Sequence, residues 1–597
     1  MKKRNQVLDI YKVNTDELFK NDKDFLKEVK KLNKEIKEVS KYEGHILDDS
    51  KTLLELFDYT EKLDERIEKV YIYAHLNNDV DLSDDKGNEN YGIAYKLYKE
   101  YASLSSYIVP ELLEKDYDLI EKYLKDNKEL KKYENTLKEI YRVKEHMLSK
   151  KEEYILKKLS DTFRTPEEVY SKLTDVDLKF DSIKDENGKN VELNESNWPT
   201  YIESKNRDVR KNAFKTFFGG YKSIINTTSE LLANEVKKNN AVSEIRKYKS
   251  AMAASLDSNN VDSKVYEKLI SAIDNNLDTV YRQWDIRKKK LGLKELHLYD
   301  TYVPLTESFD KKYTYDEARE LILESLKVMG EDYLKVLTRS FDENWIDVMP
   351  NENKRGGAYC TCCYLTHPYV LSNFNEKFGD VSTLAHELGH AMHYYYAQTN
   401  QIYSDYNYSI FVAEVASQVN EILLALHVLN TSDDKEEKIF ILDTLMKHFK
   451  SSVVRQSMFA YFEKMIHDGE QNGDILTPKY LCDNYYELNK KYFGNNVVVD
   501  EEIKYEWSRI PHFYYDFYVY QYATGYIAAL DIAYKIYNGD KKTLDNYLEF
   551  LKLGSTKDPV ASLKVAGVDL TKDDVYKNAF KVLNEQMDQF EKLIGKE

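Results

Sequence analysis

Apolar side chains recur along much of this chain at steps of three and four residues, which is the spacing of one face of an α-helix. Glycine and proline are scarce, with 20 and 9 in 597 residues, and this also favours helices. The spacing is clear in two runs near the N-terminus: Phe25, Val29, Leu32, Ile36 and Val39, then Leu56, Leu63, Ile67, Val70 and Ala74. We therefore predict a mainly α protein whose first long helices form an antiparallel hairpin across residues 44–50.

A strand pattern first occurs at residues 178–193, where two short alternating runs flank the turn sequence Asp185-Glu186-Asn187-Gly188. This pattern predicts a small β-hairpin. We place a domain boundary close to its end, near residue 195. The predicted organisation is a helical N-terminal domain over residues 1–195, which ends in the hairpin, and a second domain over residues 196–597.

Residues 345–372 interrupt the helical pattern a second time, with glycines and alternating apolar and polar side chains that predict a small sheet. The sheet directly precedes a predicted helix at residues 380–393. A strand edge there could bind an extended peptide through main-chain hydrogen bonds, or the strands could simply cover the helix. The pattern does not separate these two roles. The tyrosine-rich, polar stretch at 394–408 is predicted to be a loop.

Composition then limits the classes of function. The chain is 42% hydrophobic and 32% charged, with a formal net charge of −17. A nucleic-acid-binding protein should present a basic face, and no stretch of this sequence predicts one. The basic start, Met1-Lys2-Lys3-Arg4, is not followed by the apolar segment of a signal peptide. No run of about 18 apolar residues occurs, so we expect no membrane span.

Four cysteines in a chain of this length do not make a disulfide framework. Cys360, Cys362 and Cys363 form a cluster, and Cys482 is the fourth. The cluster could bind a soft metal ion, but no second pair completes a tetrahedral set. We expect the reduced thiols of a cytoplasmic protein.

The clearest chemical signal is the pentapeptide His386-Glu387-Leu388-Gly389-His390. Two histidines four positions apart lie on one face of a helix, about 40° apart around its axis, so both rings can reach one cation. Tetrahedral zinc accepts imidazole nitrogen at roughly 2.0–2.1 Å. Glu387 projects roughly 100° away, where it is badly placed as a ligand but well placed to take a proton from a water on the metal. This is the HExxH arrangement of zinc peptidases.

Zinc needs a third protein ligand and keeps one open position. Position 396 is Tyr396 and not histidine, which excludes the metzincin pattern. His393 lies about 10 Å along the helix from His386, so we interpret it as a packed or supporting residue. Glu414 sits among apolar residues, where an unpaired carboxylate is costly, and we predict that it is the third ligand. Glu421, seven residues further on the same face, either orients a ligating histidine or forms a helix salt bridge.

With these three ligands holding one zinc ion, the sequence predicts peptide-bond hydrolysis by attack of a metal-bound water that Glu387 activates. Glu387 then passes the proton to the leaving amine. The oxyanion that forms needs hydrogen-bond donors besides the metal. Residues 507–526 are rich in tyrosine and include His512, but the whole chain holds 51 tyrosines, so composition alone does not select this stretch.

These motifs together resemble oligoendopeptidase F, a bacterial relative of thimet oligopeptidase. The resemblance covers the helical N-terminal portion, the predicted hairpin and the region from about residue 200 onward. Besides the HExxH pentapeptide, the matching residues are Ala413-Glu414-Val415-Ala416-Ser417, Ile510-Pro511-His512-Phe513-Tyr514, Arg355-Gly356-Gly357-Ala358-Tyr359 and Asp380-Val381.

The resemblance implies a cytoplasmic zinc endopeptidase that degrades short, unstructured oligopeptides. It implies a large helical, clam-like body with a deep substrate channel, and it makes residues 196–597 the zinc metallopeptidase catalytic domain. In the family, a histidine and the tyrosines after it contact substrate and the oxyanion; His512 matches the histidine and Tyr518 the first tyrosine. The spacing for the second tyrosine falls near Gly525 and leaves three candidates: Tyr515, Tyr522 and Tyr526.

Other hypotheses stay open at this point. The cysteine cluster departs from the family pattern and could make activity sensitive to thiol oxidation. A carboxypeptidase of related architecture would need a positive group for the free C-terminus of its substrate, and Arg355 and Arg509 are candidates. A helical peptide-binding or scaffold protein with a decayed site is the non-enzymatic alternative, against which the intact motif argues. The expected partners are short peptides, with no nucleic acid and no membrane; the sequence carries no prediction of oligomeric state.

Overall fold

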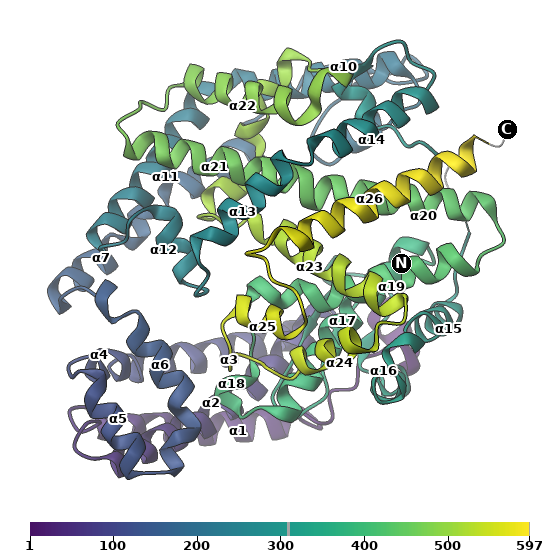
Figure 1. Ribbon diagram of the computed structural model, residues 1–597. Helices are drawn as coiled ribbons and strands as arrows, with labels where there is room; N and C mark the ends of the chain where they lie inside the picture. Colours follow the sequence, from purple (N-terminus) through teal and green to yellow (C-terminus); the bar gives the residue numbers. More distant parts are fainter. Residues whose placement is uncertain (307–310, 596–597) are drawn as a thin grey trace. The chain divides into compact units, whose positions relative to one another are not determined.

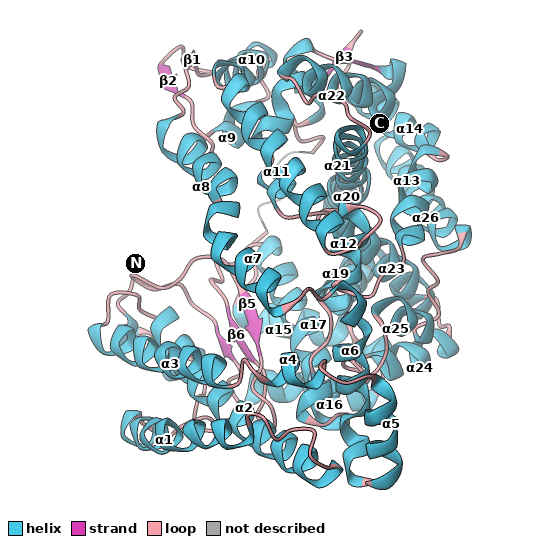
Figure 2. Cartoon of the chain, turned by 90° about the vertical axis from the view of Figure 1, so that its left-hand side faces the viewer, coloured by secondary structure: helices cyan, strands magenta, loops and turns pink. Residues whose placement is uncertain are grey.

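The computed structural model describes residues 1–306 and 311–595. Most of this part of the chain is helical, and its strands are short (Figures 1 and 2). The chain divides into two compact units. Unit 1 comprises residues 1–145, 310–427 and 532–568, and unit 2 comprises residues 146–309, 428–531 and 569–597. The prediction of a mainly α protein is confirmed.

Unit 1 is built from helices and a three-stranded sheet. Its helices are α1 (Asp22–Glu35), α2 (Ser50–Asp79), α3 (Asp85–Leu104), α4 (Ile108–Leu112), α5 (Tyr117–Asp126), α6 (Glu134–Arg142), α15 (Tyr315–Ser325), α16 (Glu331–Asp342), α17 (Phe378–Asn400), α18 (Tyr403–Tyr406), most of α19 (Ile410–Thr431), α24 (Lys541–Phe550) and α25 (Pro559–Val565). In the sheet, β4 (Ile346–Asp347) runs parallel and β5 (Tyr359–Thr361) antiparallel to the central β6 (Tyr369–Leu371). The sheet predicted ahead of the HExxH helix is therefore present, and β5 packs against α17.

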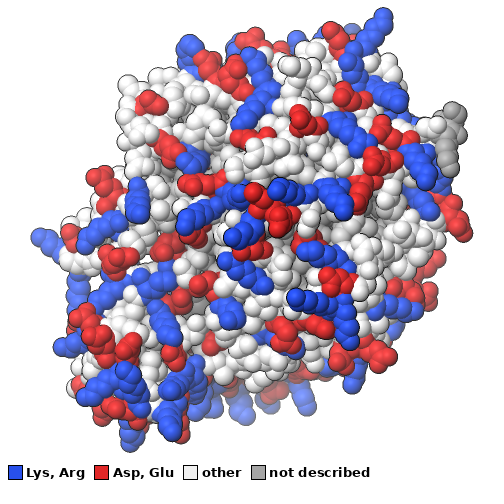
Figure 3. All heavy atoms as spheres, in the orientation of Figure 1, with Lys and Arg blue, Asp and Glu red and all other residues white. Residues whose placement is uncertain are grey.

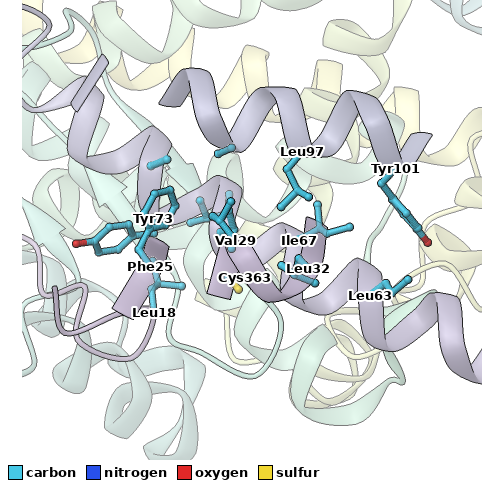
Figure 4. Packing of buried hydrophobic residues seen from close by; sticks show 14 of the residues in the cluster. Leu18, Phe25, Val29, Leu32, Leu63, Ile67, Tyr73, Leu97, Tyr101 and Cys363 are labelled. Carbon is cyan, nitrogen blue, oxygen red and sulfur yellow. The ribbon is translucent and has the colours of Figure 1, made fainter. Parts of the chain in front are cut away.

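The first two long helices form the predicted antiparallel hairpin. As residue numbers rise along α1, those of their partners on α2 fall: the ring of Phe25 stacks on Tyr73, Glu28 accepts a hydrogen bond from Arg66, and the Tyr59 hydroxyl donates to the carbonyl of Glu35. Apart from Leu56, which lies in a second buried cluster, the apolar runs seen in the sequence meet in one buried cluster, which α3 completes (Figure 4). Burial of this shared face stabilises the hairpin.

Unit 2 contains the other helices and two two-stranded sheets. Its helices are α7 (Lys150–Phe163), α8 (Thr165–Lys172), α9 (Trp198–Ile202), α10 (Arg207–Ser223), α11 (Ile225–Ile245), α12 (Ala251–Asp257), α13 (Ser263–Asp274), α14 (Leu277–Lys290), α20 (Lys435–His448), α21 (Gln456–Gln471), α22 (Pro478–Phe493), the first part of α23 (Tyr520–Tyr537) and α26 (Asp573–Ile594). The strand β1 (Ser182–Lys184) pairs antiparallel with β2 (Asn190–Glu192), as the hairpin prediction required, and Gly188 adopts φ +77° in the turn. The second sheet pairs β3 (Leu296–His297) in parallel with β7 (Val497–Val498).

The prediction of a loop at residues 394–408 is largely wrong. The helix α17 continues to Asn400, and the short α18 follows at Tyr403–Tyr406. The tyrosines of this stretch pack on neighbouring rings: Tyr395 lies against Trp345, and Tyr396 against another aromatic ring of unit 1. Tyrosine has only moderate helix propensity, and here packing of the side chains decides the backbone conformation.

The helix α19 is long and apolar enough to cross a membrane when judged by length and composition alone, and 78% of its most apolar window is buried inside the protein. Its apolar side chains include Phe411, Val415, Val419 and Leu423, each almost fully buried. Burial within the protein accounts for the apolar character of this helix. The same helix carries Glu414, whose side chain is 40% exposed and accepts a hydrogen bond from the Ser417 hydroxyl.

Candidate metal centre

The way the chain enters α17 fixes the orientation of the motif residues. Asp380 Oδ2 accepts the backbone N–H groups of Asn375 at 3.1 Å and Lys377 at 2.9 Å, which ties the preceding turn to the first turn of the helix. The apolar face of α17 is buried in unit 1 through Val381, Leu384, Ala385, Leu388, Ala391 and Met392. His386 and His390 are only partly buried, so their rings keep an accessible side.

Three predicted ligands converge within unit 1. His386 and His390 on α17 and Glu414 on α19 each offer one donor atom, and these atoms all lie within 4.8 Å of one another. The two histidine Nε2 atoms are 3.2 Å apart, and Glu414 Oε2 lies 3.3 Å from His386 Nε2 and 3.7 Å from His390 Nε2. Among the described residues, no other set of histidine, cysteine, aspartate or glutamate side chains converges in this way.

These spacings fit a tetrahedral zinc ion. Two ligands held roughly 2.0–2.1 Å from zinc at the tetrahedral angle are about 3.3–3.4 Å apart, and the three donor pairs here are 3.2, 3.3 and 3.7 Å apart. Two imidazoles and one carboxylate are also the ligand set of catalytic zinc sites, which keep one position open. The residues of this site therefore fit the ion.

Burial and mutual charge shift the pKa values of the site strongly. Burial opposes a charge on His386, but hydrogen bonds to Glu414 and Glu421 outweigh it and raise the pKa of His386 to about 10. Burial, followed by the charge on His386, lowers the pKa of His390 to about 4. Burial opposes ionisation of Glu414, yet hydrogen bonding and charge from the histidines lower its pKa to about 2. Burial raises the pKa of Glu387 to about 7. The Glu414 carboxylate and the neutral His390 imidazole are donors that suit a divalent cation, which would bind in place of the proton of His386.

Glu421 contacts the other side of the His386 ring. Its Oε2 lies 3.3 Å from His386 Nδ1, and its Oε1 accepts a hydrogen bond of 3.2 Å from the Ser382 hydroxyl. The Nδ1 atom is the ring nitrogen of His386 that does not face Glu414. Of the two roles left open for Glu421, this contact matches that of a residue orienting a ligating histidine.

The two helices that carry the ligands approach each other closely at Gly389. A Cβ atom at this position would lie 2.5 Å from Ser417 Cα and 2.6 Å from the carbonyl oxygen of Ala416. Both neighbours are backbone atoms of α19, which cannot move aside as a flexible side chain can. Glycine at position 389 is therefore a packing requirement of the site. The sequence carried a signal for it, because a glycine inside a helical pattern often marks close approach of another backbone.

Asn420 also joins the two helices, although it is not among the predicted site residues. Its Nδ2 donates to the carbonyl of Ala385 at 3.2 Å, and its Oδ1 accepts from the Tyr333 hydroxyl of α16 at 2.9 Å. Asn420 is fully buried. A buried amide needs hydrogen-bond partners of this kind. The position of Asn420 within an apolar run was therefore the sequence signal from which its role could have been predicted.

His393 is a packed residue. Its ring is 1% exposed and stacks on Tyr408, with centroids 3.6 Å apart and planes 4° from parallel. Burial, with the charge of His390, lowers the pKa of His393 to about 3. It does not belong to the converging group of donors.

His512 and Tyr518 lie together in unit 2. Their rings are nearly parallel, at 11°, with centroids 6.4 Å apart. Tyr522 meets both rings edge-on, at 5.9 Å from His512 and 5.4 Å from Tyr518. Of the other candidates for a second tyrosine, Tyr515 meets the His512 ring at 5.6 Å, whereas Tyr526 is 1% exposed and packs against His448. The structure therefore groups the predicted site residues in two sets, each within one unit.

All four cysteines are free. Burial raises the pKa values of the Cys360 and Cys362 thiols well above their ordinary range, and this protonated form reacts slowly with oxidants. On the face shown in Figure 3, basic and acidic side chains are interspersed.

Comparison with known proteins supports the same assignment. A family model described as peptidase family M3 matches residues 200–582, and one described as oligopeptidase F matches residues 111–180. The chain is 40% identical to oligopeptidase PepF of Bacillus subtilis, over all of this chain and 90% of that protein. It is 36% identical to an oligoendopeptidase F homolog of Lactococcus lactis, over all of this chain and 99% of that protein.

Solved structures share the fold. A structure from Chlamydophila abortus superposes with a TM-score of 0.94 at 33% identity, covering 99% of this chain and all of that one. Oligoendopeptidase-F from Enterococcus faecium superposes with a TM-score of 0.73 at 32% identity, covering 96% of this chain and all of that one.

A mainly helical fold that holds two histidines and a glutamate around one point, matched over its full length by oligopeptidases, defines a metallopeptidase that acts on oligopeptides. The chain belongs to peptidase family M3, in its oligoendopeptidase F group.

Proposed function

We propose that this protein is a zinc-dependent endopeptidase that hydrolyses internal bonds of short peptides, with Glu387 as its proton-transfer residue. The observation that carries the proposal is the donor set of His386, His390 and Glu414, whose spacings match the edges of a zinc coordination tetrahedron. Family membership supports the coarser activity. Two parts of the proposal go beyond what family membership supports: that the ion is zinc, and that Glu387 transfers the proton.

In this mechanism His386, His390 and Glu414 hold the ion. When bound, zinc supplies a Lewis acid that polarises the scissile carbonyl and lowers the pKa of water to roughly 7. Glu387 is 7% exposed and follows the first ligand directly on α17. It takes the proton of the attacking water and gives it to the leaving amine, so one carboxyl group serves first as base and then as acid.

His512 and Tyr518 are proposed to donate hydrogen bonds to the oxyanion of the tetrahedral intermediate. Burial lowers the pKa of His512, so its imidazole is neutral near pH 7 and carries one N–H donor. Tyr518 offers a hydroxyl, and Tyr522 is the favoured second tyrosine because its ring contacts both His512 and Tyr518. Donors of this kind act on charge that develops only during the reaction.

The contacts of two arginines favour internal cleavage over carboxypeptidase action. Arg355 Nε lies 2.8 Å from Asp79 Oδ1, and Asp79 is fully buried. Arg509 binds both carboxylate oxygens of Glu195 at 2.9–3.1 Å. Each arginine already neutralises a carboxylate, so neither offers an unpaired charge for the C-terminus of a substrate.

The cytoplasm is the proposed location, because four free cysteines suit a reducing compartment. The proposal also retains the division into residues 1–195 and 196–597, with the catalytic machinery in the second segment.

Replacing Glu387 by glutamine tests the proton-transfer role. Glutamine keeps the shape of the side chain but cannot accept the proton, so we expect turnover of a short peptide to fall by about 10²–10⁴-fold. Metal analysis of the purified variant should still find one zinc ion per chain. Glu376→Gln is the matched control, because it changes an exposed carboxylate of unit 1 in the same way, and it should keep full activity.

A second variant distinguishes the role of a metal ligand from that of the catalytic base. Glu414→Ala removes one of three protein ligands, so it should lose zinc as well as turnover. Zinc content unchanged in Glu414→Ala would remove Glu414 from the ligand set, and turnover retained in Glu387→Gln would exclude Glu387 as the base.

A further inference from the structure

Two consecutive residues just before Tyr518 adopt a backbone conformation that side chains disfavour. Asp516 has φ +51° and Phe517 has φ +58°. L-amino acids other than glycine occupy this left-handed region rarely, and asparagine or aspartate are its usual occupants. Phenylalanine there is an outlier that persists only where surrounding contacts hold it. The turn lies between the 3-10 helix Pro511–Tyr514, which carries His512, and α23.

A buried carboxyl group holds the backbone of this turn. The N–H of Phe517 donates a hydrogen bond of 2.7 Å to Glu463 Oε1, on α21. Glu463 is 0% exposed, and its Oε2 has no hydrogen-bond partner among the described residues. Burial raises the pKa of Glu463 well above its usual range, so the group is a neutral carboxylic acid near pH 7. The hydrogen bond to Phe517 is therefore the one polar contact of this side chain in the described part of the chain.

Two further contacts fix the turn. The Ser255 hydroxyl of α12 donates to the carbonyl of Asp516 at 2.5 Å. The Phe517 ring is 1% exposed and packs on His467 of α21, with centroids 4.5 Å apart, and edge-on against Tyr266 of α13 at 5.7 Å. Three helices of unit 2 thus hold the backbone and the ring of the turn.

Burying the carboxyl group of Glu463 costs free energy, because one of its oxygens is left without a hydrogen bond to any described residue. An apolar side chain of similar size would fill the same space without this cost. Ordinary core packing does not need the carboxyl group. A backbone held in a disfavoured conformation does need an acceptor for its buried N–H, and Glu463 supplies that acceptor one residue before Tyr518.

We propose that Glu463, together with Ser255, is a positioning residue: it clamps the left-handed Asp516–Phe517 turn and so sets the placement of Tyr518 relative to His512 for transition-state contact. This inference rests on the proposed catalytic roles of His512 and Tyr518. Glu463 itself touches no substrate. It acts through the backbone of the turn, and a group held within a few tenths of an ångström performs better than one that must be ordered during the reaction.

The test compares six variants of the full-length, zinc-loaded enzyme: the four single changes described next, Tyr518→Phe, and Tyr518→Phe combined with Glu463→Leu. Glu463→Leu removes the acceptor, and Ser255→Ala removes the second hydrogen bond while leaving the core intact. Glu463→Gln keeps a carbonyl acceptor of the same shape. Glu437→Leu is the matched control, since it removes a buried carboxyl group of α20 in the same unit, 5% exposed.

We expect kcat to fall about tenfold in Glu463→Leu and severalfold in Ser255→Ala, with KM nearly unchanged, because the contact is made mainly in the transition state. Glu463→Gln should restore most of the rate. The combination of Glu463→Leu with Tyr518→Phe should cost little more than Tyr518→Phe alone, because both changes remove one function.

Hydrogen–deuterium exchange of the segment around residues 513–519 provides a readout apart from activity. Exchange should accelerate in Glu463→Leu and Ser255→Ala but not in Glu463→Gln or Glu437→Leu. If Glu463→Leu matches Glu437→Leu in both kcat and exchange while Tyr518→Phe is impaired, the positioning role is wrong and the proposed function stands. If the wild type shows no zinc-dependent hydrolysis, or Tyr518→Phe keeps full activity, the catalytic role assumed for Tyr518 fails, and the positioning role fails with it, whatever the exchange shows.

Discussion

Glu421 is placed to control the protonation of His386, a proposed metal ligand. It contacts His386 at Nδ1, 3.3 Å away, while the Nε2 atom of the same ring faces Glu414 and His390. A carboxylate at Nδ1 keeps the proton on that nitrogen and leaves Nε2 as a lone-pair donor. The ring is then fixed in both orientation and tautomer.

Replacing Glu421 by glutamine should therefore weaken zinc affinity by about 10–100-fold, because the ring loses the charge that makes Nε2 a stronger donor. Competition with a fluorescent zinc chelator measures the affinity. If Glu421 forms only a helix salt bridge, zinc affinity will stay unchanged and stability will drop by no more than about 0.5 kcal/mol.

At this scale the sequence predicted which side chains converge where the signal is local. His386 and His390 follow from helix geometry, and Glu414 from the cost of a carboxylate among apolar residues. For Glu421 the sequence left two hypotheses open, orientation of a ligating histidine or a helix salt bridge, because residue spacing does not show which side chain on another helix it contacts. Glu463 was not foreseen, since nothing in its local sequence shows that it meets a strained turn more than 50 residues later.

The helices α17 and α19 form the site because they approach so closely. His386 and His390 come from one helix and Glu414 from the other, so the distance between the two backbones sets the spacing of the three proposed donor atoms. At Gly389 the backbone of α19 lies so near that a Cβ atom would meet Ser417 and the carbonyl of Ala416.

Alanine at position 389 should destabilise the fold by about 1–3 kcal/mol through overpacking, although alanine is the better helix former. We also expect reduced zinc content, because the helices must separate to admit the Cβ atom. Gly379→Ala is the matched control on the same helix: no atom lies within 4 Å of its Cβ position, so its stability should be unchanged or slightly higher. Thermal unfolding and metal analysis check both variants; equal behaviour of the two would contradict the packing requirement.

Elements with strong periodicity or turn chemistry were predicted correctly. The α1–α2 hairpin followed from apolar spacing, and the β1–β2 hairpin from Asp185-Glu186-Asn187-Gly188. The extension of α17 through its tyrosines was missed, because those rings are held by Tyr333, Trp345 and other residues that lie elsewhere in the sequence. Tertiary contacts of this kind override local propensity.

At the scale of the molecule, each compact unit is assembled from three separate segments of the chain. The sequence predicts that helices dominate, but local patterns carry little information on which distant segments join one unit. Recognition of the family came from several short motifs in combination, and the family models and full-length relatives then established it.

The most direct test of the central claim is to identify the products that the enzyme forms from a mixture of short peptides by mass spectrometry. The mixture should contain each peptide with a free and with an amidated C-terminus, and it should be incubated with the enzyme as purified, with a chelator, and after zinc is restored. We predict internal cleavage at similar rates for both C-termini, loss of cleavage with the chelator, and recovery with zinc. Cleavage that survives metal removal, or stepwise release of single residues from free C-termini alone, would contradict a zinc-dependent oligoendopeptidase.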